Sequence, residues 1–202
     1  MKTIITIQHT QSLQHTNGMI GSWTDWDLTD LGVEQAKRIG QRLSAELGDA
    51  RFAMHSSDLL RARRTAQIVA GYLGIEPACT EALREFNLGE AVGQTKAWAS
   101  QRRLPWNTVD DRPYAGAESK RDVWARLSAF LGQVMAAPDE NVIVVSHGGA
   151  LSVFYALWLG LDVTMLNRCD LRSSAGGVSF LQEDKDGKRV IARLNDLFYI
   201  RP

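Results

Sequence analysis

Two short strand-like runs in this chain each lead directly into a histidine. Residues 3–8 are followed by His9, and residues 141–146 are followed by His147. In an open α/β sheet, ligands bind in the crevice beyond the carboxyl ends of parallel strands. We therefore expect the two imidazoles to face one functional site, where each can act as a nucleophile, a base or a metal ligand.

Helical and strand-like patterns alternate along the rest of the chain. Apolar residues recur at helical spacing over 31–47 behind a capping Thr29, again up to residue 73, and over 121–135. Short strand-like runs lie at 51–55 and 76–80, and a helical pattern at about 149–159 follows His147. Such alternation predicts an α/β fold with three layers, a mostly parallel sheet and helices on both faces.

Three further segments complete the predicted organisation. Ser56, Ser57 and Asp58 precede a helical pattern and are expected to supply its capping side chains. Residues 177–181 and 189–194 read as a hairpin at the sheet edge. Residues 89–116 lack sustained periodicity, which is typical of a loop-rich lid. We expect a single domain over 1–202 that carries this lid.

Composition excludes several classes of partner. Lysine plus arginine and aspartate plus glutamate number 23 each, so no overall field favours nucleic acid or an acidic membrane. The longest apolar segment is too short to span a bilayer, and no secretory leader is recognisable. Cys79 and Cys169 are far apart and are expected to be free, buried thiols in a reducing compartment. These features predict a cytoplasmic protein.

Four side chains stand where phosphoryl transfer would need them. His9 can be the nucleophile, Arg61 opens a helix whose free N–H groups help bind an anion, and His147 precedes two glycines at another helix start. Glu85 is a candidate general acid. Serine hydrolysis is not indicated, because the chain has no Gly-x-Ser-x-Gly elbow, and its histidine spacing matches no established zinc site.

The order of several motifs carries more weight than any one residue. They are His-Thr-Gln-Ser at 9–12, Ser-Ser-Asp-Leu-Leu-Arg-Ala-Arg-Arg-Thr-Ala at 56–66, Leu-Arg-Glu-Phe at 83–86, Gly-Ala-Glu-Ser at 116–119 and Ser-His-Gly-Gly at 146–149. Over nearly its whole length, the chain resembles the histidine phosphatase superfamily, also called phosphoglycerate-mutase-like.

The resemblance implies a function and a role for each matching residue. His9 would be phosphorylated during turnover, Arg61 and His147 would hold phosphate oxygens, and Glu85 would donate the leaving-group proton. No metal or other cofactor would be required. The substrate would be a small phosphorylated metabolite, and a phosphatase is expected rather than a mutase because the longer mutase branch carries an insertion that this chain lacks. The exposed sheet edge would permit a homodimer.

The chain departs from the family pattern around the nucleophile. Gln8 stands where the family has arginine, Thr10 where it has glycine, and His15 where asparagine is usual, with Asn17 nearby. A further glutamine-like contact falls at Gly21. Two interpretations follow. In one, His15 gains a proton beside bound phosphate and replaces part of the missing charge; in the other, the pocket suits a less charged ligand, or binding persists without catalysis.

The remaining expectations concern substrate contacts. Gln8, His15, Asn17 and Gly148 are candidate substrate-binding residues. Trp23 either lines the leaving-group pocket or fills the core. Two rival functions stay open, namely a phosphoglycerate-mutase-type phosphotransferase and a catalytically impaired protein that binds a phosphorylated ligand.

Overall fold

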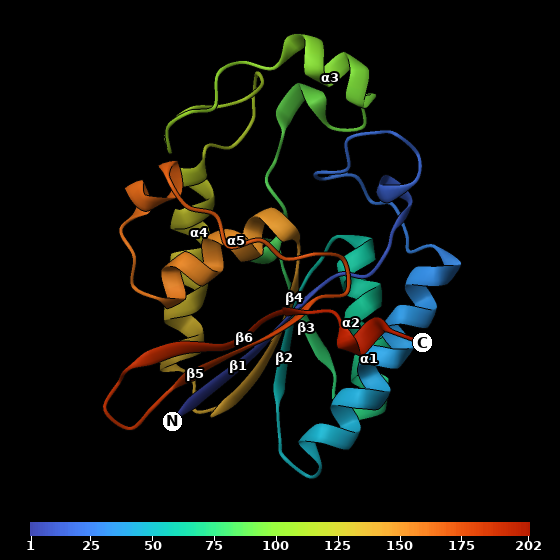
Figure 1. Cartoon of the computed structure of the whole chain (residues 1–202), viewed down its shortest axis with the longest axis vertical. Coiled ribbons are helices and arrows are strands. Elements are labelled where there is room, and N and C mark those ends of the chain that lie inside the picture. The colour runs from blue at the N-terminus through green and yellow to red at the C-terminus, as the bar shows by residue number, and fades with distance from the viewer.

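A six-stranded mixed sheet forms the middle layer of the molecule (Figure 1). The computed structural model describes all residues, 1–202. The strand order is β3-β2-β4-β1-β5-β6; the first four are mutually parallel, and β5 and β6 form an antiparallel hairpin at one edge. The strands are β1 (Lys2–Gln8), β2 (Ala53–Ser57), β3 (Pro77–Thr80), β4 (Asn141–Ser146), β5 (Val178–Glu183) and β6 (Arg189–Asp196).

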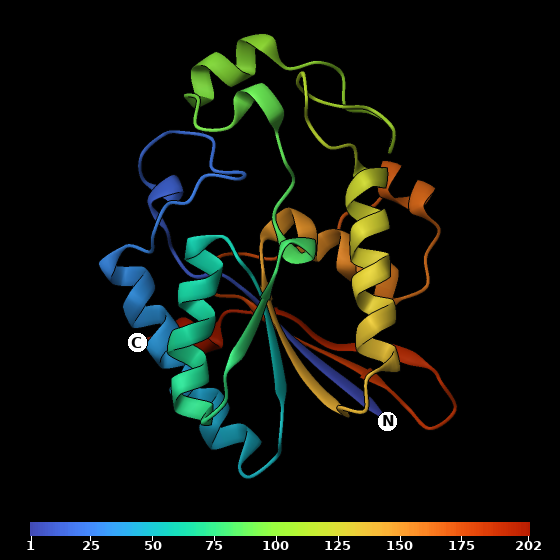
Figure 2. The same cartoon turned by 180° about the vertical axis from the view of Figure 1, so that it is seen from behind.

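Helices cover both faces of this sheet, as Figures 1 and 2 show from opposite sides. The helices are α1 (Asp30–Leu47), α2 (Leu60–Leu73), α3 (Lys96–Arg102), α4 (Lys120–Ala136) and α5 (Gly148–Trp158). Because side chains alternate along a strand, Ile5 of β1 packs in the α1–α2 core while Ile4 packs in the α4–α5 core. The predicted three-layer α/β fold and its edge hairpin are confirmed.

Strand register brings the two strand-end histidines together. β1 and β4 are parallel neighbours in which Gln8 pairs with Ser146, so His9 and His147 follow at the same level. The backbone N–H of His9 donates to the carbonyl oxygen of Ser146 at 2.9 Å. The distance between the two imidazole centroids is 5.0 Å.

Helix ends follow local sequence signals in most places. The Thr29 side chain accepts from the Gly32 amide at the start of α1, and Gly74 ends α2 with a φ of 66°, which glycine adopts without strain. The prediction that Ser56, Ser57 and Asp58 cap α2 is wrong, because Leu59 is the N-cap residue and Asp25 Oδ1 accepts from the first helical amide, that of Leu60, at 2.7 Å. β2 instead extends through Ser57, which carries that side chain into the site.

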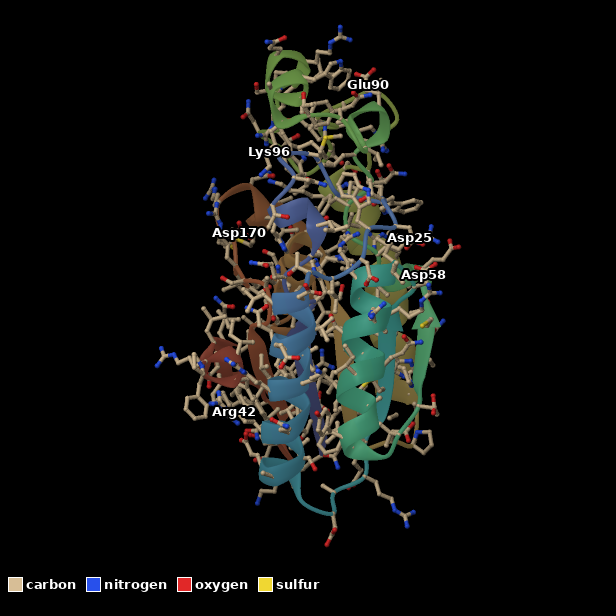
Figure 3. The ribbon with its side chains drawn as sticks, turned by 90° about the vertical axis from the view of Figure 1, so that its right-hand side faces the viewer. Asp25, Arg42, Asp58, Glu90, Lys96 and Asp170 are labelled. Atoms are coloured by element: carbon tan, nitrogen blue, oxygen red, sulfur yellow. The ribbon has the colours of Figure 1, made fainter.

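The segment 89–116 rises above the carboxyl end of the sheet as a loop-rich cap (Figure 1). It contains α3, which the sequence pattern did not predict, and its Ala91, Ala99 and Tyr114 form a small apolar cluster with the adjacent Ala117. Figure 3 shows Lys96 on this cap.

Two further findings concern the cysteines and membrane insertion. Both thiols are free, but Cys79 is exposed and Cys169 half-buried, so the prediction that they are buried is wrong. None of the helices combines the length and the apolar character needed to cross a bilayer.

Candidate active site

His9 is a buried imidazole held in one tautomer. Its Nδ1–H donates to the carbonyl oxygen of Thr10 at 2.9 Å, which leaves the lone pair on Nε2. Arg61 Nε lies 3.3 Å from this Nε2 and donates to it. Burial, and next the charge of Arg61, lower the pKa of His9 well below its usual value. His9 is therefore neutral at physiological pH, and its unprotonated Nε2, which accepts from Arg61, carries the lone pair that a nucleophile needs.

Arg61 lies in the first turn of α2 and is fully buried. Its Nη1 donates to Thr24 O at 2.8 Å and its Nη2 donates to Ser22 O at 2.7 Å. Burial lowers the pKa of Arg61 to about 10, so the side chain remains cationic at neutral pH. Two carbonyl groups thus fix one positive charge directly beside the Nε2 atom of His9.

His147 is a second buried imidazole, and Ser57 determines its orientation. His147 Nε2 lies 2.8 Å from Ser57 Oγ, which also accepts from the Leu59 amide at 3.3 Å. Either group can donate in this pair; when the hydroxyl proton of Ser57 points to Nε2, the ring proton is on Nδ1. The Nδ1 atom is buried without a protein partner. Because buried polar groups rarely lack partners, this atom is available to a bound ligand, and in the Nδ1–H tautomer it donates to an oxyanion.

Glu85 forms the opposite side of the site, at the N-terminus of α5. Its carboxylate accepts from the backbone amides of Gly149, Ala150 and Phe86 at 2.9–3.0 Å. Helix N-termini favour such a negative group because their first amides have no partner within the helix. A Cβ atom on Gly149 would stand 2.6 Å from Glu85 Oε1, so glycine is required for this approach.

Gln8, at the arginine position of the family pattern, is nearly buried and makes one side-chain hydrogen bond. Ser173 Oγ donates to its Oε1 at 2.5 Å. The amide lies against Gly148, whose Cβ atom, if present, would be 3.4 Å from Gln8 Nε2. Position 8 therefore presents a neutral amide beside the start of α5 instead of a second guanidinium.

His15 stacks on His9 at the entrance to the site, with ring centroids 5.5 Å apart. The backbone amide of Ser12 donates to its Nδ1 at 3.0 Å, so Nε2 carries the ring proton. Burial, Arg61 and Lys96 lower the pKa of His15. In this structure His15 thus presents a neutral Nε2–H donor, and its protonation beside bound phosphate stays a prediction.

Gln14 is a site residue that sequence reasoning missed. Its Nε2 lies 3.5 Å from His9 Nε2, and its Oε1 is buried without a partner. A Cβ atom on Gly21 would stand 1.5 Å from Gln14 Oε1, so the Gln14 amide fills the space beside this glycine. Gly21 was the one available signal, because a glutamine-like contact was expected there.

A cavity of about 450 Å³ opens from this group toward the cap. Apolar side chains and Lys96, its one lysine or arginine, line it together with Glu85 and His15. The lining residues are Gln14, His15, Met19, Ile20, Gly21, Ser22, Glu85, Phe86, Leu88, Lys96, Trp106 and Gly149. Lys96, Phe86 and Trp106 were not predicted as site residues, because their approach depends on how the cap folds over the sheet.

Of the predicted substrate-binding residues, His15 alone lines this cavity; Gln8 and Gly148 adjoin the two strand-end histidines, and Asn17 and Trp23 make other contacts. Asn17 is exposed, and its Oδ1 accepts from the Met19 amide in a local turn. The Trp23 indole N–H donates to the backbone oxygen of Glu85 at 2.7 Å, and the Arg84 guanidinium stacks on its ring. Trp23 therefore supports the backbone of Glu85. Histidine, cysteine, aspartate and glutamate side chains form no group of three that could bind a metal ion.

Comparisons with known proteins agree with this arrangement. The sequence profile of the histidine phosphatase superfamily (branch 1) matches residues 4–197. A 2,3-bisphosphoglycerate-dependent phosphoglycerate mutase from Sinorhizobium fredii is 36% identical over 162 residues, covering 74% of this chain and 75% of that protein.

Two solved structures have the same fold over almost the entire chain. Bacillus stearothermophilus YhfR is 25% identical with a TM-score of 0.82, and all of both chains is covered. A mycobacterial glucosyl-3-phosphoglycerate phosphatase is 23% identical, also with a TM-score of 0.82, and 96% of this chain and 99% of that one are covered. The family match and the mutase relative support phosphatase or mutase activity. This chain belongs to the histidine phosphatase superfamily, branch 1.

Proposed function

We propose that the protein is a phosphatase that hydrolyses a small phosphate monoester through a phosphohistidine at His9. The observation that carries this proposal is the unprotonated Nε2 of His9, which accepts from a buried guanidinium at 3.3 Å and lies next to a second neutral imidazole. Phosphoryl transfer requires positioning and positive charge more than covalent machinery, and this group supplies both together with a nucleophile.

The reaction divides into two displacements. In the first, His9 Nε2 forms a bond to phosphorus, the ester P–O bond breaks, and the carboxyl group of Glu85 gives a proton to the departing alkoxide. In the second, Glu85 takes a proton from water, the water oxygen attacks phosphorus, and the P–N bond breaks to release phosphate. Arg61 and the Nδ1–H of His147 stabilise the equatorial oxygens in both steps.

The cavity beside Glu85 would receive the leaving group. Phe86 and Trp106 meet edge to face at 5.6 Å and form an apolar wall, while Lys96 adds one positive charge near the cap. This combination favours an alcohol with a short apolar body and an acidic group.

The acidic group is tested by changing Lys96 alone. In Lys96→Met, KM for a carboxylate-bearing phosphate ester should rise about two- to fivefold, because partly exposed ion pairs contribute about 0.2–1 kcal/mol. KM for an uncharged aryl phosphate should not change. Lys37→Met on α1, where Lys37 pairs only with Glu34, is the control. Equal effects of Lys96→Met on both esters would remove the argument for an acidic leaving group.

The phosphohistidine is tested by mass spectrometry after mixing with an aryl phosphate. Wild type should gain one phosphoryl group on His9, and His9→Ala should lose both this adduct and hydrolysis. His55→Gln is the matched control, because His55 lies away from the site, packed edge to face on Phe130. Wild-type hydrolysis by His9→Ala would refute the proposed function.

A mutase remains the second candidate because the Sinorhizobium relative bears that name at 36% identity. The alignment covers nearly equal shares of both chains, 74% and 75%, so this mutase is of similar length. Chain length therefore does not separate the two activities. Product analysis on 3-phosphoglycerate, with and without the bisphosphorylated form, distinguishes phosphate release from transfer within the glycerate.

A further inference from the structure

Gln8 is the residue at which this phosphoryl site departs furthest from its family pattern, and its side chain has an asymmetric environment. The carbonyl oxygen Oε1 accepts from Ser173 Oγ at 2.5 Å. The amide nitrogen Nε2 has no hydrogen-bond partner in the protein, although it carries two protons. One end of the amide is thus fixed, and the other end is free to donate.

The whole amide lies beside the start of α5, near the place where an oxyanion would bind. Gln8 immediately precedes His9, and a Cβ atom on Gly148, the residue after His147, would lie 3.1 Å from Gln8 Oε1 and 3.4 Å from Gln8 Nε2. Gly148 begins α5, and the next two amides, those of Gly149 and Ala150, donate to Glu85. Gln8 Nε2 and the Gly148 amide are therefore the neighbouring donors at this helix start.

Ser173 is held rigidly enough to fix the amide. Its loop is tied to Gln8 by two backbone hydrogen bonds, from the Gln8 amide to Gly177 O at 3.0 Å and from the Gly176 amide to Gln8 O at 3.1 Å. The next residue, Ser174, donates its amide to Asn195 Oδ1 at 2.8 Å. Ser173 thus approaches Gln8 from a loop that both the end of β1 and β6 anchor.

The direction of the Ser173–Gln8 hydrogen bond determines which end of the Gln8 amide, the N–H donors or the carbonyl oxygen, faces the bound anion. An amide has one accepting and one donating end, so a hydroxyl that donates to Oε1 turns Nε2 toward the site. If the amide turned over, its carbonyl oxygen would face the phosphoryl oxygens and repel them. Arginine, with donors only, would need no such partner, which links Ser173 to the glutamine at position 8.

From this geometry we propose that Ser173 is a positioning residue that orients the Gln8 amide so that Nε2 donates to the bound phosphoryl group. This inference rests on the proposed function for the identity of the anion. Gln8 then contributes a neutral donor in place of the absent arginine charge, and Ser173 acts on the anion through Gln8.

The test is a double-mutant cycle read by calorimetric binding of inorganic phosphate to the full chain. Ser173→Ala should weaken phosphate binding about 3- to 10-fold, the effect of one neutral hydrogen bond. Gln8→Ala should weaken it at least as much. Adding Ser173→Ala to Gln8→Ala should change nothing further, because the side chain that Ser173 orients is then absent.

Three companion variants separate positioning from loop stability. Ser173→Thr keeps the hydroxyl and should restore binding. Gln8→Glu keeps an acceptor for Ser173 but replaces the donor with a negative oxygen, so it should bind phosphate less well than Gln8→Ala. Ser174→Ala is the matched control, since Ser174 Oγ accepts only from Asn195 Nδ2, at 3.3 Å. Thermal melting of every variant confirms folding.

The outcomes are decisive. Equal phosphate affinity of Ser173→Ala, Ser174→Ala and wild type would overturn the inference, as would a Ser173→Ala effect that persists in the Gln8→Ala background. If wild type binds phosphate but forms no phosphohistidine, the proposed function fails while the cycle still decides the role of Ser173. If wild type hydrolyses esters but the cycle shows no coupling, only the positioning role fails.

Discussion

The two buried imidazoles predict that this protein loses stability in mild acid while its nucleophile stays active. The exposed fractions of His9 and His147 are 1% and 0%, and burial is the largest cause of their lowered pKa values. The charge of Arg61 is the next cause for both. Neither ring can accept a proton in the folded state until the pH lies well below 6.5.

The sign and the size of the effect follow from proton uptake by the unfolded chain. Above about pH 6.5, folded and unfolded states both hold neutral imidazoles, so stability does not depend on these groups. Below that pH the unfolded chain binds protons that the folded protein does not, and the free energy of unfolding falls. Between about pH 7.5 and about pH 5.5, one such imidazole costs about 1.4 kcal/mol, and the pair about 2.7 kcal/mol.

The measurement is urea unfolding at several pH values across this range, with the m value held as a check on two-state behaviour. His147→Gln should remove about half of the pH dependence that the buried pair supplies, whatever its effect on stability at neutral pH. His15 and His55 also have lowered pKa values but are less buried, so they add a smaller slope. A free energy of unfolding that stays constant from about pH 7.5 to about pH 5.5 would refute the reasoning.

Two glycine substitutions test the packing of the site. Gly149→Ala should lower kcat at least about tenfold and destabilise the protein by about 1–3 kcal/mol, since its Cβ would stand 2.6 Å from Glu85 Oε1 and the carboxylate must move. The control Gly71→Ala in α2, with open space around it, should stabilise the protein by about 0.4–1 kcal/mol. Steady-state kinetics and urea unfolding measure both variants, and equal effects of the two substitutions would contradict the clash at Gly149. Gly21→Ala should reduce kcat as much as Gln14→Ala, because the new Cβ displaces the Gln14 amide. The double variant Gly21→Ala/Gln14→Ala should then have the same kcat as the single variants. A kcat lowered by the product of the two single effects would show that the two substitutions act separately.

The sequence by itself determined the three layers of the fold and the position of the two histidines at the ends of neighbouring strands. Alternating patterns specify which residues must be buried, and a parallel sheet then leaves few arrangements for strands that end in His9 and His147. Helix signals such as Thr29 and Gly74 are local, so they could be read without the fold. Arg61 was also predictable, because its place at a helix start depends on nearby residues.

Only the tertiary structure decided the finer chemistry of the site. The Ser57–His147, Ser173–Gln8 and Gln14–Gly21 contacts join residues that no periodic pattern connects. Each contact depends on the direction of a side chain and on the path of a loop, and a shift of that loop by a few ångströms would break the contact. A hydrogen bond forms or fails over less than one ångström, whereas burial of an apolar stripe tolerates much more, so the sequence pattern defines the core better than the donors around the anion.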